Sequence, residues 1–291
     1  MASALPHPRL RPGVTCYRGF RLSLRRPRKR LEVPAGMTVL LIVFEEKLRL
    51  TRTADLSDPV EANASTPLLC GPHTSARTGE HDGRLSGVEV AFAPWAAFTL
   101  FGTALQPLAN EAVGLHELLS TRADDLTDAL ASAVGWRDRF ALLDTVLWEW
   151  ARRGPEHSAR VAWAWQELAR KAGAVPIPAL ARRAGWSQRQ MEKRFREQIG
   201  LTPKTTARVF RLQRALQLLV SGLSSAEVAV LAGYHDQAHF GHECKAMTGH
   251  APCRFLARRA AGGQDPSFTD RFEGQATGVL LPATARAEGA A

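Results

Sequence analysis

Residues 181–203 read ARRAGWSQRQMEKRFREQIGLTP, and residues 229–252 read AVLAGYHDQAHFGHECKAMTGHAP. The two stretches match at a spacing of 48 residues and then of 49, in the pairs Ala181/Ala229, Gly185/Gly233, Trp186/Tyr234, Met191/Phe240, Phe195/Cys244, Gly200/Gly249 and Pro203/Pro252. Such self-similarity indicates that one structural unit occurs twice, with a single residue inserted in the second copy.

Each copy predicts a short helix, a glycine turn and a second helix. Glycine supplies the positive φ that redirects the chain within a few residues. Ser187 and Asp236 are good N-caps for helices over 188–198 and 237–247. In such a helix-turn-helix unit the second helix buries one face and presents the other to a DNA major groove. A helix over 203–220 joins the copies and spans roughly 27 Å, so the two exposed helices would lie about one DNA turn apart.

The positive charge is concentrated in the same segment. Residues 151–260 hold 19 Lys and Arg against 7 Asp and Glu, a net charge of +12, within a chain whose total is +10. An excess of this size is typical of a surface that binds a polyanion, although a solvated basic face would give the same count. The repeat, more than the charge, favours DNA.

The front half has a different pattern. Short β-prone runs at 14–23, 37–44, 45–53, 68–70 and 87–92 are separated by Gly, Pro and Ser breaks, which predicts a small sandwich or barrel. Helical patterns follow from Pro94 to the break at Gly154-Pro155. The expected fold is α+β, with a β-rich sensing or dimerisation domain over 1–153, an all-α DNA-binding domain over 154–260 and a disordered tail over 261–291.

Residues 156–259 resemble the DNA-binding domain of the AraC/XylS family of bacterial transcription regulators. The matching residues are Leu180-Ala181, Gly185-Trp186-Ser187, Arg194-Phe195, Arg211, Ala215-Leu216, Leu218-Leu219, Val228-Ala229, Ala232-Gly233-Tyr234, Asp236, Phe240, Thr248-Gly249 and Pro252. Cys244 replaces the family's usual aromatic residue and His242 its frequent Arg, which should loosen a small core and change base readout. The front half is similar, less specifically, to the N-terminal domain of a subgroup of these regulators.

The polar faces of the two exposed helices carry the candidate DNA contacts. Arg and Lys donate to guanine, Gln pairs with adenine and Glu accepts from cytosine. The candidate base-reading residues are Arg189, Gln190, Glu192, Lys193, Gln237, Gly241 and His242, of which the resemblance favours Arg189, Glu192 and Lys193. Lys204, Arg208 and Lys245 are the candidate phosphate contacts, which position the protein without reading sequence.

No enzyme signature stands out. His235, His239 and His242 have the spacing of ligands on one helix face, but surface histidines are the favoured interpretation, and no metal or cofactor is expected. None of the four cysteines forms a C-x-x-C pair, and no apolar run is long enough for a membrane span.

Double-stranded DNA is therefore the expected partner, in the cytoplasm and nucleoid-associated. A small-molecule effector, RNA polymerase and a second copy of the chain are further candidates. The alternative from another class is a cupin-type or DNA-repair enzyme with an appended helix-turn-helix domain.

Overall fold

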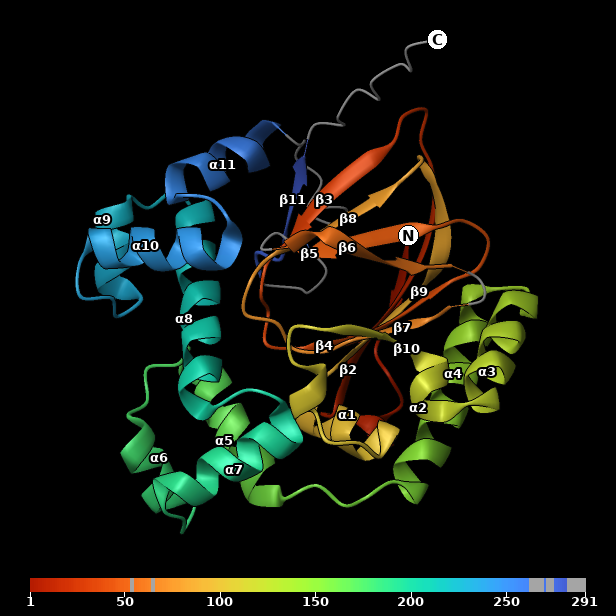
Figure 1. Ribbon diagram of the computed structural model, residues 1–291, viewed down its shortest axis with the longest axis horizontal. Helices are drawn as coiled ribbons and strands as arrows, with labels where there is room; N and C mark the ends of the chain where they lie inside the picture. Colours follow the sequence, from red (N-terminus) through yellow and green to blue (C-terminus); the bar gives the residue numbers. More distant parts are fainter. Residues whose placement is uncertain (53–54, 64–65, 262–269, 271–274, 282–291) are drawn as a thin grey trace.

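The N-terminal half is built from two antiparallel β-sheets. The computed structural model describes residues 1–52, 55–63, 66–261, 270 and 275–281 (Figure 1). One sheet has the strand order β1 (Ala2–Ala4), β2 (Val14–Ser23), β9 (Arg84–Phe92), β4 (Thr38–Val43), β7 (Leu68–Cys70) and β10 (Ala112–Gly114). The other has the order β11 (Gly278–Leu281), β3 (Arg28–Glu32), β8 (Arg77–His81), β5 (Leu48–Arg52) and β6 (Asp55–Ala62). The predicted β-rich front half is confirmed.

Strand β4 shows why the first sheet sits in the middle of this domain. All six of its residues are buried, because each face of the strand is covered. Leu41 and Val43 pack with Leu48 and Leu50 of the second sheet. Their neighbours Leu40 and Ile42 pack instead among the helices that cover the outer face. The aromatic residues Phe98, Phe101, Trp136 and Trp148 belong to this outer core.

The helices on the outer face are α1 (Pro94–Phe101), α2 (Leu115–Leu119), α3 (Thr121–Ser132) and α4 (Trp136–Arg153), with short 3₁₀ turns η1 (Pro8–Leu10) and η2 (Gln106–Leu108). The C-terminal half then runs α5 (Ala159–Arg170), α6 (Ile177–Arg183), α7 (Gln188–Ile199), α8 (Pro203–Val220), α9 (Ser225–Leu231), α10 (Gln237–Thr248) and α11 (Pro252–Ala261). Among the described residues, no helix combines the length and apolarity that crossing a bilayer requires.

The helical half packs directly against the sheet half. The indole of Trp95 in α1 lies 4.6 Å, between ring centroids, from the imidazole of His157 just before α5. The amide of Leu105 donates to the carbonyl of Glu197 in α7 over 2.8 Å. Further along, Gly36 leaves room for the ring of Phe210 in α8, which would crowd a side chain there. The first helix-turn-helix unit and the joining helix α8 are thus both anchored to the N-terminal half.

Strand β11 requires a correction to the expected disordered tail. Residues 278–281 pair with β3 in antiparallel register, Gly278 opposite Glu32 and Leu281 opposite Lys29. Val279 is fully buried, because its side chain completes a core shared with α8 and α11. The prediction missed this strand since a short apolar run in a Gly- and Ala-rich segment gives little local signal. Residues 262–269, 271–274 and 282–291 of the predicted tail lie outside the described residues.

Candidate nucleic-acid interface

The first repeat folds as a tight helix-turn-helix, α6 followed by α7. Gly185 adopts a φ of +68°, which turns the chain between the two helices. The Ser187 hydroxyl accepts from the Gln190 amide, and the Gln190 side-chain oxygen accepts from the Ser187 amide over 2.9 Å, which forms a capping box. Met191 and Phe195 are fully buried beneath α7. This packing fixes which face of α7 points outward.

The outward face of α7 carries positive charge. At about 100° per residue, Arg189 and Lys193 lie opposite Met191 and Phe195, and both are exposed. Glu192 is half-buried at the side of the helix, 3.5 Å from Arg196. Gln190 is exposed, and its side-chain oxygen accepts from the Ser187 amide, so its NH₂ group is the part of the side chain that the helix cap leaves unused.

The second repeat, α9 and α10, reproduces this arrangement. Gly233 turns the chain at a φ of +76°, and the Asp236 carboxylate accepts from the His239 amide over 2.7 Å to cap α10. That hydrogen bond, helped by His235, lowers the pKa of Asp236. Phe240 is fully buried, at the position equivalent to Met191.

Cys244 lies in the small core where the replacement of the family's aromatic residue is expected to loosen the packing. It is fully buried, and its thiol reaches the His250 carbonyl at 3.4 Å. Burial raises the pKa of this thiol to about 11. The cysteine is therefore a packed, uncharged residue of the second unit.

The outward face of α10 is smaller and less charged than that of α7. His242 and Lys245 are exposed opposite Phe240, and Gln237 is exposed at the first turn. Between them, Gly241 has no atom within 4 Å of the point where a Cβ would stand. The backbone is bare at this position, so another molecule can approach it closely.

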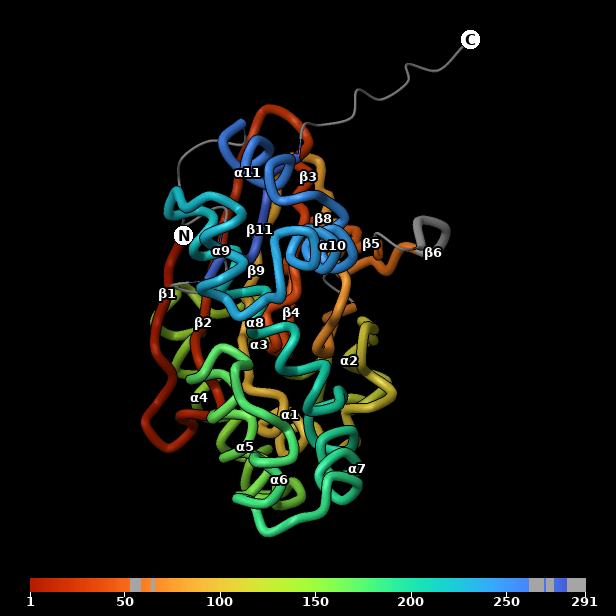
Figure 2. Tube along the Cα trace, turned by 90° about the vertical axis from the view of Figure 1, so that its left-hand side faces the viewer, coloured from red at the N-terminus to blue at the C-terminus, as the bar shows by residue number. Residues whose placement is uncertain are grey.

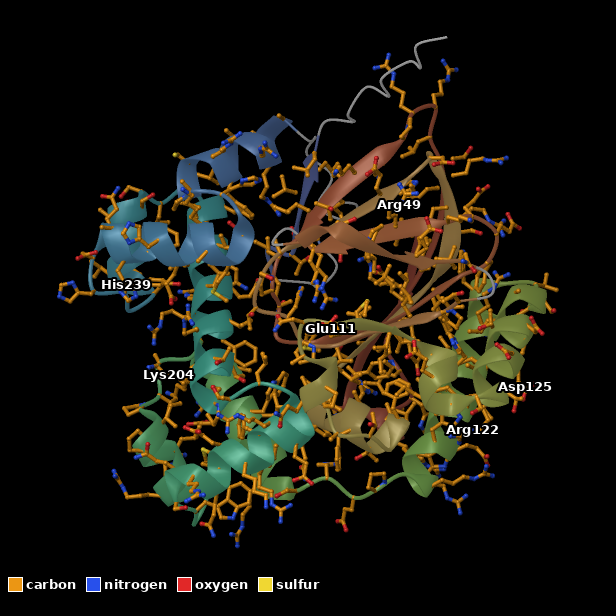
Figure 3. All side chains as sticks on the ribbon, viewed as in Figure 1. Arg49, Glu111, Arg122, Asp125, Lys204 and His239 are labelled. Atoms are coloured by element: carbon orange, nitrogen blue, oxygen red, sulfur yellow. The ribbon has the colours of Figure 1, made fainter. Side chains whose placement is uncertain are left out.

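The candidate phosphate contacts differ in whether the side chain already forms an ion pair within the protein. Lys204 lies exposed in the first turn of α8, on the same side of the molecule as His239 of α10 (Figure 3). Arg208 instead forms an ion pair with Glu243 of α10, with 2.6 Å between Nε and Oε1. Glu243 is a functional candidate that the sequence analysis missed, because its partner lies 35 residues earlier in the chain.

The two outward faces belong to one continuous helical body. Figures 1 and 2 show α7 near the start of α8 and α10 near its other end. Helix α8 joins the two units and, with 18 residues, is roughly 27 Å long.

The histidine spacing noted in the sequence does not produce a metal cluster in the described part of the chain, where no group of three or more His, Cys, Asp or Glu side chains is placed to hold an ion. His235 contacts Asp236 and His239 packs edge-on against Tyr234. All four cysteines are free thiols.

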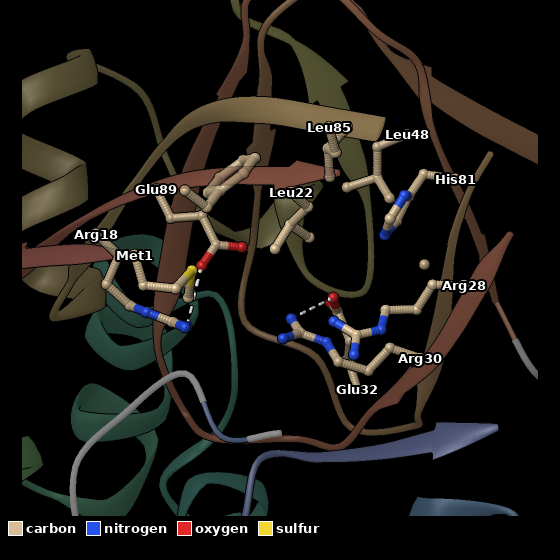
Figure 4. Close-up of a pocket in the computed structure, with 12 residues that line it drawn as sticks. Met1, Arg18, Leu22, Arg28, Arg30, Glu32, Leu48, His81, Leu85 and Glu89 are labelled. Atoms are coloured by element: carbon tan, nitrogen blue, oxygen red, sulfur yellow. Dashed lines mark hydrogen bonds and ion pairs between the residues drawn. The ribbon is translucent and has the colours of Figure 1, made fainter. Parts of the chain in front are cut away.

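A pocket also lies between the two sheets of the N-terminal half (Figure 4). Its cavity holds about 70 Å³ and is lined by Met1, Arg18, Phe20, Leu22, Arg28, Arg30, Glu32, Leu48, Gly79, His81, Leu85 and Glu89. Four of the lining residues form two ion pairs, Arg18 with Glu89 and Arg30 with Glu32. Burial, with Arg28 and Arg30 nearby, lowers the pKa of His81 to about 4. The pocket thus combines leucine side chains with a surplus of arginine.

Two family models match the chain. Residues 180–258 match a family described as a helix-turn-helix domain, and residues 2–114 match a family described as a domain of unknown function, DUF6597. The first match covers both repeats and both outward faces. No curated protein shows significant similarity to the chain.

Several solved structures of ToxT from Vibrio cholerae are similar in arrangement. One, at 1.65 Å resolution, has 10% identity and a TM-score of 0.43, covering 84% of this chain and 98% of ToxT. Another, bound to an unsaturated fatty acid, has 10% identity and a TM-score of 0.44, covering 88% of this chain and 100% of ToxT. Because the identity and the TM-score are both low, we take the fatty acid only as a ligand of ToxT.

Proposed function

We propose that this chain is a DNA-binding transcription regulator of the AraC type, and that its helix-turn-helix region over residues 180–258 reads two successive major grooves of one duplex. Helix α7 enters one groove and α10 the next, while α8 holds them about one helical turn apart. The observation that carries the proposal is the pair of capped, outward-facing helices within a segment of net charge +12.

The two helices have different reading chemistry. On α7, Arg189 and Lys193 are the cations best placed to donate to guanine, and Glu192 at the edge accepts from cytosine. On α10, Gln237 and His242 supply hydrogen bonds, and the bare backbone at Gly241 allows a close approach. We expect the DNA block that α7 contacts to show a stronger sequence preference than the block that α10 contacts.

Phosphate contacts position the protein on the duplex. Lys204 at the start of α8 and Lys245 on α10 are exposed, and neither forms an ion pair or a side-chain hydrogen bond with another described residue. Arg208 forms an ion pair with Glu243, so we expect it to bind phosphate more weakly than Lys204 does. Each of these neutralised phosphates should contribute to the salt dependence of binding.

The N-terminal half is proposed to modulate this activity. Residues 1–153 would sense an effector or hold a second copy of the chain, and residues 154–260 would bind DNA in the cytoplasm, where RNA polymerase is the natural further partner. The pocket between the sheets is the candidate effector site. With about 70 Å³ of cavity, it accepts a small ligand. Its arginines favour one that carries a negative charge.

Selection of bound sequences from a random duplex pool tests the proposal. The full chain, at near-physiological salt, should enrich two short blocks about one helical turn apart. Affinity for the enriched duplex should exceed that for random duplex by at least about 10³-fold. Binding that depends on salt but enriches no sequence would contradict the proposal.

A further inference from the structure

The C-terminal strand β11 joins the second helix-turn-helix unit to the wall of the N-terminal pocket. In Figure 1, β11 lies beside β3, at the edge of the sheet nearest to α11. The strand comes after the last DNA-binding helix in the sequence, yet it is part of the N-terminal sheet. A single segment therefore contacts both functional halves of the molecule.

An ion pair and the hydrogen bonds around it hold this segment in place. The guanidinium of Arg259, at the end of α11, binds both carboxylate oxygens of Asp270 over 2.7–2.8 Å and also donates to the Gly278 carbonyl. The same carboxylate accepts from the amide of Thr277. Both partners of this ion pair are nearly buried, with side chains 14% and 15% exposed. Breaking one partner would leave a poorly solvated charge.

The joining helix α8 takes part as well. The side-chain amide of Gln213 donates to the carbonyl of Pro34, two residues after β3, and to that of Ala276, two residues before β11. Gln213 is 3% exposed. The amide of Val33 also donates to the Thr277 carbonyl over 3.1 Å. Helix, sheet and C-terminal strand thus meet at one buried point.

Strand β3 has two faces with different neighbours. Arg28, Arg30 and Glu32 line the pocket between the sheets. The intervening Leu31 is buried in the core of the second helix-turn-helix unit, together with Val279 and with Phe255 of α11. Because side chains alternate along a strand, a shift of β3 that accommodates a ligand on one face moves the other face too.

We propose that β11 is an intramolecular strap that fixes the second helix-turn-helix unit to β3, so that the state of the pocket and the placement of α10 are coupled. The proposal extends the proposed function, because it names the element through which the N-terminal half would act on DNA reading. Linkage makes the coupling reciprocal, so DNA on the reading helices must also alter the stability of β3.

Hydrogen exchange on the full-length chain tests the strap without DNA. Asp270→Asn keeps the shape of the side chain and removes its charge. It should raise exchange in β3 and α11 about tenfold, as expected when a buried hydrogen-bonded partner is lost, and leave α6 and α7 unchanged. The matched control is Asp125→Asn on α3, an exposed residue on the far side of the molecule, which should leave β3 and α11 unchanged (Figure 3).

The same measurement with the selected duplex tests the coupling. In the wild type, the duplex should protect α7, α10 and β3, and in Asp270→Asn the protection of β3 should disappear while that of α7 remains. Unchanged exchange in β3 and α11 for folded Asp270→Asn would overturn the strap. If the wild-type chain selects no duplex, the proposed function fails, and the DNA-free exchange still decides whether the strap exists.

Discussion

Gly241 offers a substitution that should stabilise the protein and weaken its DNA binding. It is the fifth residue of α10, within the regular part of the helix. A glycine in a helix interior costs about 1 kcal/mol relative to alanine, because its backbone has more freedom to lose on folding. No atom lies within 4 Å of the added Cβ, so Gly241→Ala should recover that free energy without strain.

The expected effect on DNA has the opposite sign. If the backbone at Gly241 approaches the groove, a methyl group displaces base-edge contacts that are worth about 1–3 kcal/mol. That range corresponds to a roughly tenfold to hundredfold loss of affinity for the selected duplex. Gly241→Leu should fold equally well, since the space is open, and should bind still more weakly.

Two assays separate these effects. Thermal or denaturant unfolding should show Gly241→Ala more stable than the wild type, and fluorescence anisotropy should show weaker binding to the selected duplex. Binding to a random duplex is the control, and it should change little because phosphate contacts are untouched. If Gly241→Leu folds and binds the selected duplex as tightly as the wild type, α10 does not approach DNA through this face.

Three further predictions concern charge and backbone. Lys204→Gln should reduce the slope of log affinity against log salt by about one, measured by anisotropy between low and moderate salt. His81 has a pKa of about 4 in the fold against about 6.5 unfolded, so the unfolded chain binds more protons between these values. Stability should therefore fall as pH drops from 6.5 towards 4, by up to about 3 kcal/mol, and His81→Gln should flatten this dependence in unfolding curves. Gly200 and Gly249 end equivalent helices with positive φ, but only the former abuts the Leu105 carbonyl, 2.7 Å from an added Cβ. Gly200→Ala should thus lower the unfolding midpoint more than Gly249→Ala, which carries only the left-handed strain of about 1–2 kcal/mol.

The DNA-binding half could be predicted from sequence because its helix caps and turn glycines are close together in the chain and occur in both repeats. Ser187 and Asp236 cap helices that start one residue later, and glycines end them. Each signal is weak alone, but the repeat places it twice in the same order. The helix bounds expected at 188–198 and 237–247 therefore differ from the observed ends by a single residue.

Contacts between distant segments could not be predicted in this way. Residues 25–32 read RRPRKRLE, a basic composition that suits a solvated turn, yet Arg28–Glu32 forms β3 because β8 and β11 pair with its two edges. Nothing near Glu243 in the sequence indicates that it holds Arg208. The pocket likewise draws its lining from several strands, and each lining residue is unremarkable in its own segment.

The most direct test of the two-groove account compares two single substitutions by repeating the duplex selection. Arg189→Ala removes a cation from α7, and His242→Ala removes a side chain from α10; both are exposed, so neither should affect folding. The account predicts that each variant loses sequence preference in one block only, a different block for each, while the spacing between blocks is kept. Loss of preference in the same block by both variants, or in neither block, would contradict it.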